Sequence, residues 1–199
     1  MSMPISIPPG SEQIAAWARR RGYPFTATPE LGWYRAWEPF FTLVSPAYYF
    51  SAVQCMIERT SVVLVEPWCA VGDAEPLGRA VLAFVSHPGI RHRAAARAGG
   101  NHMTRVSFLG QSRPQEQQTG DSAWDNQAVT FASSPLEAVR ALTPSLRKLL
   151  LGWNFEGHIE LKPGGLVLHV ADALPRPEDY ERLLGWIPMV LDKALKERP

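Results

Sequence analysis

The segment His158–Val170, HIELKPGGLVLHV, is the clearest secondary-structure signal in the chain. Two strand-like runs, His158–Lys162 and Leu166–Val170, flank the tripeptide Pro163–Gly165, whose residues suit a tight turn. Apolar residues alternate in the second run, as they do in a half-buried strand. We therefore predict a β-hairpin here, and with it a mainly antiparallel sheet.

Helices are predicted on both sides of this hairpin. Upstream, Ser134 to Glu137 forms a capping box with proline at the first helical position, and Thr143–Pro144 repeats the cap-plus-proline signal. One broken helix or two short helices are therefore expected over 135–151. Downstream, 177–197 carries a continuous apolar stripe that Pro188 is expected to kink. A further helix is predicted over 11–21.

Several apolar runs supply the remaining strands. The run SVVLVE at 61–66 is expected to be a central strand covered on both faces, with RAVLAFVS at 79–86 as its antiparallel neighbour. Weaker strands are predicted over 103–109 and 127–132. The aromatic, proline-punctuated stretch 23–50 is interpreted as short strands, and the polar stretch 112–126 as an exposed loop.

These elements predict an α+β fold in a single domain over 1–199, with 1–10 extended or flexible. A mainly antiparallel sheet would pack against about three to four helices, including a long C-terminal amphipathic helix. Helical crossovers of the repeated βαβ kind are not apparent.

Composition restricts the classes of function. The chain has 199 residues, 46% hydrophobic and 20% charged, and a formal net charge of +1, which makes no case for a nucleic-acid or membrane partner. The N-terminus lacks the features of a signal peptide, and no apolar stretch reaches the ~20 residues of a membrane span. We expect a cytoplasmic protein with Cys55 and Cys69 as reduced, buried thiols.

The C-terminal half resembles a diverse set of bacterial proteins that have no assigned activity. The residues that carry the resemblance are VTFASSPLEAVRALTPSLRKLL at 129–150, followed by the hairpin and the amphipathic helix. The resemblance implies an α+β fold and slightly favours a non-catalytic role. It transfers no functional residues.

Motifs with catalytic associations stand in contexts that favour a structural role. Ser145 and Lys148 match a Ser-x-x-Lys pattern, but the companion motifs of serine acyl-transfer enzymes are absent. The triplet Gly120-Asp121-Ser122 lies in a polar loop and does not follow an apolar strand. The histidine and cysteine spacings do not suit zinc, so neither a metal nor a cofactor is predicted.

The hairpin offers one further cluster of titratable residues. His158 and His169 are expected to be cross-strand neighbours, interpreted as lying on a solvent-facing surface. Strand periodicity places Glu156, His158 and Glu160 on one face, where the two carboxylates would raise the pKa of the histidine.

A basic segment over 79–113 gives the one candidate binding site. No aspartate or glutamate occurs between Pro76 and Gln115. If 90–98 is helical, Arg93 and Arg97 lie one turn apart and could hold a phosphate, a carboxylate or an acidic surface. The near-zero net charge favours an ordinary solvated surface instead. The candidate anion ligands are Arg91, His92, Arg93, Arg97 and Arg105.

Three functions remain open. The first is a non-catalytic module that binds a protein partner or self-associates, which exposed aromatic residues among 33–50 would favour. The second is binding of an anionic ligand or nucleic acid through the basic segment. The third is a hydrolase-like enzyme, which predicts a deep pocket with convergent polar groups. No membrane partner is expected.

Overall fold

The structure is a computed structural model that describes residues 7–41, 43, 45–68, 79–99 and 115–196. The described strands are β1 (Phe25–Thr26), β2 (Tyr48–Ile57), β3 (Thr60–Trp68), β4 (Leu82–Ser86), β5 (Ala94–Ala98), β6 (Glu116–Gln117), β7 (Ala128–Ala132), β8 (Gly157–Lys162) and β9 (Gly165–Val170). The described helices are α1 (Ser11–Arg21), α2 (Leu31–Arg35), α3 (Ser122–Asp125), α4 (Pro135–Ala141), α5 (Pro144–Gly152) and α6 (Pro177–Ala194).

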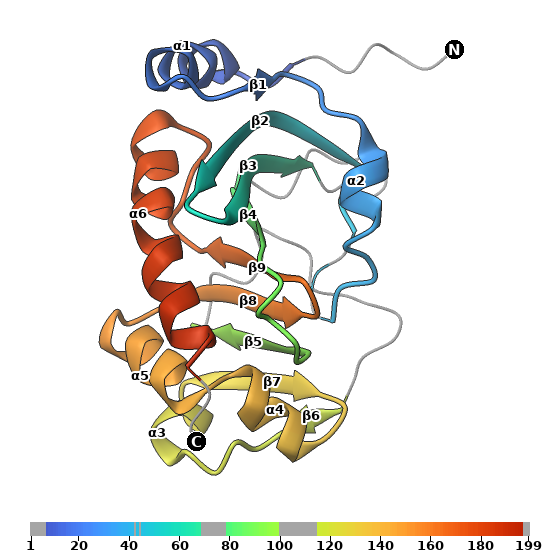
Figure 1. The fold of residues 1–199 in the computed structure, drawn as a ribbon, viewed down its shortest axis with the longest axis vertical. Coiled ribbons are helices and arrows are strands. Elements are labelled where there is room, and N and C mark those ends of the chain that lie inside the picture. The colour runs from blue at the N-terminus through green and yellow to red at the C-terminus, as the bar shows by residue number, and fades with distance from the viewer. Residues whose placement is uncertain (1–6, 42, 44, 69–78, 100–114, 197–199) are drawn as a thin grey trace.

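All nine described strands belong to one antiparallel sheet, in the order β1-β2-β3-β4-β9-β8-β5-β7-β6 (Figure 1). The predicted C-terminal hairpin is confirmed as β8–β9. It pairs with β4 on one side and with β5 on the other. The last strands of the chain therefore join the two halves of the sheet, which sequence order alone would not place together.

One face of the sheet is covered by helices. Figure 1 shows α1, α5 and α6 along the same side of the strands, with α6 running across them. Alternate strand residues such as Leu64, Val85 and Leu168 are fully buried against helical residues such as Tyr180 and Leu183. Burial of alternate residues on each strand is what a period-2 pattern dictates for a packed face.

Helices α1 and α6 both contact an irregular position in β2 through hydrogen bonds. Ser51 has a positive φ of 53° where the register between β2 and β3 shifts. Its carbonyl accepts a 3.0 Å hydrogen bond from the Tyr180 hydroxyl, and its hydroxyl lies 2.7 Å from that of Ser11. This β-bulge thus presents polar groups to the starts of both α1 and α6.

The opposite face carries a second, aromatic core. Val63, Phe84 and Val167 from the sheet pack beneath α2 and the segment that follows it. The covering side chains are Tyr34, Trp37, Phe40 and Leu43, and Tyr49 of β2 packs into the same core. Because β3, β4 and β9 are buried on both faces, their sequences are continuous apolar runs.

Most predicted elements are confirmed. Helices form at 11–21, at 135–141 and 144–152 as two separate units, and at 177–194, where the helix continues through Pro188. The runs at 61–66 and 79–86 are antiparallel neighbours, although the second strand begins at Leu82. The predicted strand over 103–109 lies outside the described residues, as does Cys69. Cys55 is buried, with a free thiol.

The prediction of strands over 23–50 is wrong in part, and the helix considered for 90–98 does not form; tertiary contacts explain both. Residues 31–35 form helix α2 within the stretch predicted as strands, because helical spacing lets Trp33 and Trp37 contact each other and the sheet at once. Residues 94–98 form strand β5, since pairing with β7 and β8 on both sides outweighs the helix propensity of alanine. From residue 115 onward, the predicted loop includes β6 and α3.

Within the part of the chain that the structure describes, no helix combines the length and the apolar character that crossing a bilayer requires.

Candidate functional site

Those predicted anion ligands that the structure describes lie just before β5 and along it. Residues 93 and 97 are separated by an even number of positions in extended backbone, so their side chains share one face of the sheet. Arg97 is the cross-strand partner of His158, whereas Arg91 is exposed in the preceding loop. Arg105 lies outside the described residues. The strand thus brings Arg93 and Arg97 to one face, although not through the helical spacing that the sequence indicated.

Arg93 acts as a link between the sheet and the segment after α2. Its guanidinium donates to the Pro39 carbonyl and, at 3.4 Å, to Glu160 Oε1. It also lies over the Phe41 ring, 4.0 Å from the centroid. Glu160 Oε2 accepts a 2.8 Å hydrogen bond from the Phe41 backbone N–H. Because Glu160 is almost fully buried, these contacts hold the segment 39–41 against the sheet.

A second carboxylate binds the loop before β5. Glu137 of α4 accepts a 2.7 Å hydrogen bond from the Arg93 backbone N–H and lies 3.1 Å from His92 Nδ1. Two of the predicted anion ligands therefore already contact carboxylates of the chain itself. Anion binding stays a prediction, and exposed Arg91 is the ligand through which to test it.

The histidine pair of the hairpin is buried, not solvent-facing as predicted. His158 and His169 are cross-strand partners, as expected, and both are almost fully inaccessible. Burial lowers the pKa of His158, and Arg97 lowers it further, whereas Glu160 opposes the shift. The predicted rise in the pKa of His158 is therefore wrong, because desolvation outweighs the one nearby carboxylate. Glu156 precedes β8 and is exposed.

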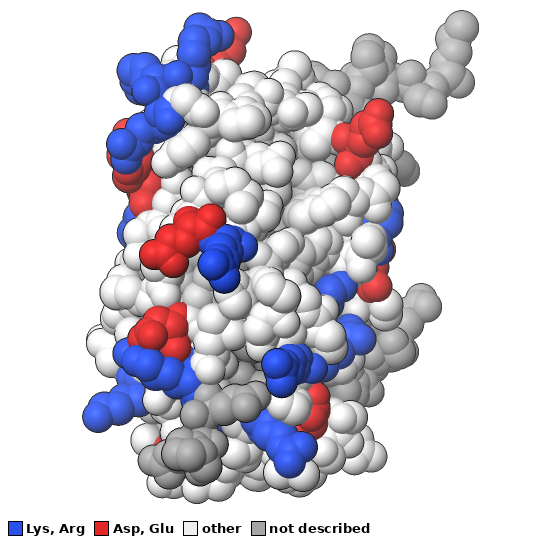
Figure 2. All heavy atoms as spheres, in the orientation of Figure 1, with Lys and Arg blue, Asp and Glu red and all other residues white. Residues whose placement is uncertain are grey.

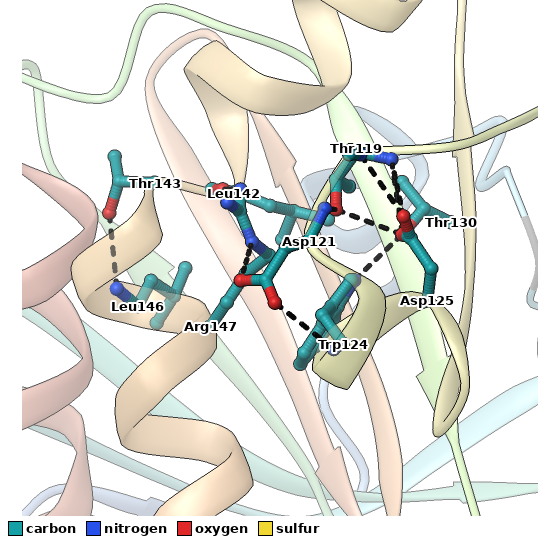
Figure 3. A network of polar contacts seen from close by, with 10 residues as sticks. Thr119, Asp121, Trp124, Asp125, Thr130, Leu142, Thr143, Leu146 and Arg147 are labelled. Carbon is teal, nitrogen blue, oxygen red and sulfur yellow. Dashed lines mark hydrogen bonds and ion pairs between the residues drawn. The ribbon is translucent and has the colours of Figure 1, made fainter.

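The triplet Gly120-Asp121-Ser122 has a structural role (Figure 3). Asp121 Oδ1 accepts from the Trp124 N–H, and Asp121 Oδ2 accepts from Arg147 Nε at 3.1 Å. The carboxylate thereby caps α3 and joins it to α5, where Arg147 is buried and also donates to the Leu142 carbonyl. The hydrogen bond from Arg147 is the main reason that the pKa of Asp121 is lowered.

Two further candidates for chemistry among the described residues are a metal site and the Ser-x-x-Lys pattern. They contain no group of three or more histidine, cysteine, aspartate or glutamate side chains that could hold a metal ion. Ser145 and Lys148 are both exposed on α5, in keeping with a solvated helix surface.

An aromatic groove is formed where α2 stands over the sheet, with a volume of about 490 Å³. We call it the α2 groove. Its floor is Ala52, Gln54, Ser61, Val63 and Ser86, from the neighbouring strands β2, β3 and β4. Its walls are Pro24, Thr26, Pro29, Glu30, Trp33 and Tyr34. Its volume lies within the range typical of ligand sites.

The aromatic wall is fixed before any ligand arrives. Trp33 is 43% exposed, yet its ring makes edge contacts with Tyr34, Trp37 and Phe84 at centroid distances of 5.0–5.6 Å. Tyr34 stacks on Tyr49 at 4.2 Å, and burial raises the pKa of the Tyr34 phenol well above its ordinary value. The wall therefore offers an accessible indole that has little freedom left to lose on binding.

The α2 groove is nearly neutral. Glu30 is the one acidic or basic residue of the lining, and the other polar side chains of the lining are hydroxyls and one amide. Figure 2 shows that few charged side chains lie over β1, β2 and β3 on the face in view, between the charges of α1 and those beside α2. This composition suits an uncharged or cationic ligand better than an anionic one.

Only part of this site could be predicted from the sequence. The exposed aromatic residues anticipated among 33–50 are Trp33 and Tyr48, whereas Tyr34, Trp37, Phe40, Tyr49 and Phe50 are buried. Gln54, Ser61 and Ser86 come from three strands and belong to no motif, so sequence reasoning missed them. A smaller hollow of about 270 Å³ lies elsewhere, lined in part by Trp153 and Trp186, whose rings stack at 4.7 Å.

Comparisons with known proteins give the fold and no family. No protein-family model matches the chain, and no curated protein matches it either. Among solved structures, the chain is similar to the crystal structure of the mycobacterial trehalose monomycolate transport factor A, TtfA. The TM-score is 0.58 at 12% sequence identity, over 95% of this chain and 97% of that one. At this identity the likeness concerns the fold alone.

Proposed function

We propose that this chain is a non-catalytic binding protein that takes a segment of a partner protein into the α2 groove. The observation that carries the proposal is the position of Trp33. Its indole is held by three ring contacts, is 43% exposed and borders a groove of about 490 Å³. Exposed tryptophans in concave, pre-positioned sites are typical anchors of protein interfaces.

The chemistry of the lining favours binding over catalysis. The α2 groove contains two serines, but its lining holds neither histidine nor lysine, the bases that most often activate a serine nucleophile. The partly exposed Arg93 and the buried Glu160 bind each other and the segment 39–41, and neither lines the groove. TtfA, which shares the fold, is named as a transport factor, a description that agrees with a binding role.

The test compares three forms of the protein: wild type, Trp33→Ala and Met189→Ala. Met189 is the matched control, because it is equally exposed at 43% but lies on α6. Proteins captured from a cell extract by the wild type are identified and re-tested in purified form. We expect a direct partner whose affinity falls at least ~10-fold for Trp33→Ala, a loss of about 1.4 kcal/mol, and is unchanged for Met189→Ala.

Light scattering on the purified chain tests whether the partner is a second copy of the chain itself. A dimer that dissociates in Trp33→Ala would identify a second copy of the 22.1 kDa chain as the occupant. Equal partner affinity in all three forms, with a monomer throughout, would contradict the proposal.

Anion binding is a second candidate, and one observation favours it. Arg91, His92 and Arg140 border the same small hollow, and Arg91 and Arg140 are basic residues outside the contacts of Arg93. Binding of a short oligonucleotide should then weaken steeply with salt and be lost in Arg91→Glu. Binding that is unaffected by both changes would exclude this site.

A further inference from the structure

The shape and the chemistry of the α2 groove restrict what the partner segment can be. We infer that it is a proline-rich segment in the polyproline II conformation, with a lysine or arginine beside the prolines. This inference rests on the proposed function and specifies its ligand.

The position of the groove excludes addition of a partner strand. The floor belongs to β2, β3 and β4, each of which is paired with neighbours on both sides within the sheet. Backbone groups in these strands point along the sheet toward those neighbours, so they do not face the groove. A ligand above the floor meets side chains, and its own backbone cannot extend the sheet there.

The floor also disfavours an amphipathic helix. A docked helix needs a continuous apolar strip against its apolar face. Here the apolar floor residues Ala52 and Val63 are interrupted by Gln54, Ser61 and Ser86. These three side chains are better matched to a ligand that brings unpaired backbone carbonyls into the groove.

A polyproline II segment has the complementary properties. It makes no internal hydrogen bonds, so its carbonyls are free to accept from the Ser61 and Ser86 hydroxyls and the Gln54 amide. Proline has no N–H, so few donors are left unpaired when the segment is bound. Its pyrrolidine rings can pack on the indole of Trp33, and its conformation is already formed before binding. Rigid ring and rigid ligand together reduce the entropy lost on association.

The charge of the groove indicates which residue should flank the prolines of the ligand. Glu30 is exposed on the wall of the groove, and none of the described cations lies within ion-pair distance of it. At the other end of α2, Arg35 is already paired with Glu38 at 2.7 Å. A basic residue beside the prolines would therefore meet Glu30, whereas an acidic one would meet an unfavourable charge.

The experiment selects a displayed library of random 12-residue peptides on the wild-type protein, with Trp33→Ala as the counter-selection. We expect enriched peptides to contain two or more prolines and an adjacent lysine or arginine. Synthetic copies should bind at least ~10-fold more weakly to Glu30→Lys, and no more weakly to Glu58→Lys. Glu58 is the matched charge control, because it is exposed in the β2–β3 turn and does not line the groove.

The outcomes separate this inference from the proposed function. Enriched peptides that depend on Trp33 but lack proline would overturn the inference and leave the proposed function standing. If proline-rich peptides bind Glu30→Lys as tightly as wild type, the inference that a basic residue flanks the prolines is wrong. Failure to enrich any peptide above the Trp33→Ala background, with Trp33→Ala shown to be folded by circular dichroism, would count against both.

Discussion

A single carboxylate, Glu160, connects three separate parts of the chain. It lies on β8, accepts the Phe41 N–H and contacts the guanidinium of Arg93. Removing it leaves a buried donor and a partly buried cation without their partner.

We expect Glu160→Ala to lower the free energy of unfolding by about 1–3 kcal/mol, measured by urea denaturation. Glu160→Gln should cost less, because its amide oxygen can still accept from Phe41. Glu58→Ala, at an exposed turn position, is the control and should change stability by less than about 0.5 kcal/mol. Similar losses for Glu160→Ala and Glu58→Ala would show that the buried contacts of Glu160 contribute little.

Asp121 gives a pH-dependent prediction at the same scale. Its pKa is lowered in the folded protein, chiefly by the hydrogen bond from Arg147. A group with a lowered folded pKa stabilises the fold above its unfolded pKa of about 3.9, and this contribution is lost as pH falls through the folded value. Asp121→Asn keeps a helix-capping side chain but removes the charge.

We therefore expect wild type to be more stable than Asp121→Asn at pH 7 and the difference to be smaller at pH 3, below the unfolded pKa of the carboxyl. Urea midpoints at the two pH values measure this. A difference that is the same at both would mean that the ion pair with Arg147 contributes no stability.

At the scale of elements, two glycines should respond in opposite directions to the same substitution. A Cβ on Gly165, at the start of β9, would lie 2.2 Å from the Val85 carbonyl oxygen and 2.6 Å from Trp37 Cη2. A Cβ on Gly185, within α6, would have no such neighbouring heavy atom within 4 Å.

Gly165→Ala should therefore destabilise the protein strongly, by more than about 2 kcal/mol, because backbone must move where β9 meets β4. Gly185→Ala should stabilise it by about 0.5–1 kcal/mol. Alanine has a higher helix propensity than glycine at this exposed position, and it reduces the conformational entropy of the unfolded chain. Thermal unfolding of both variants measures the pair. Destabilisation by Gly185→Ala would contradict the structure assigned to α6.

For the whole molecule, the shared strands predict cooperative unfolding. The helical core and the aromatic core lie on opposite faces of the same strands β3, β4 and β9. Unfolding of these strands would therefore disrupt both cores at once. We expect unfolding curves from far-UV circular dichroism and from tryptophan fluorescence to superimpose. Two separated transitions would show that the faces unfold independently.

What the sequence determined by itself is local. The N-terminal helix, the two capped helices, the C-terminal helix and the β8–β9 hairpin are specified by caps, turn residues and hydrophobic period, which act over a few neighbouring residues. The antiparallel pairing of the strands at 61–66 and 79–86 also followed, because consecutive strands tend to pair.

Only the tertiary structure decided the rest. The β8–β9 hairpin inserts between β4 and β5, and this buries His158, His169 and Glu160, which the sequence placed in solvent. The alanine-rich β5 is a strand because it has partners on both sides. The α2 groove combines residues of α2 with three strands. Each of these outcomes depends on contacts between residues distant in the chain, whose energies outweigh local propensity and leave no mark in a short stretch of sequence.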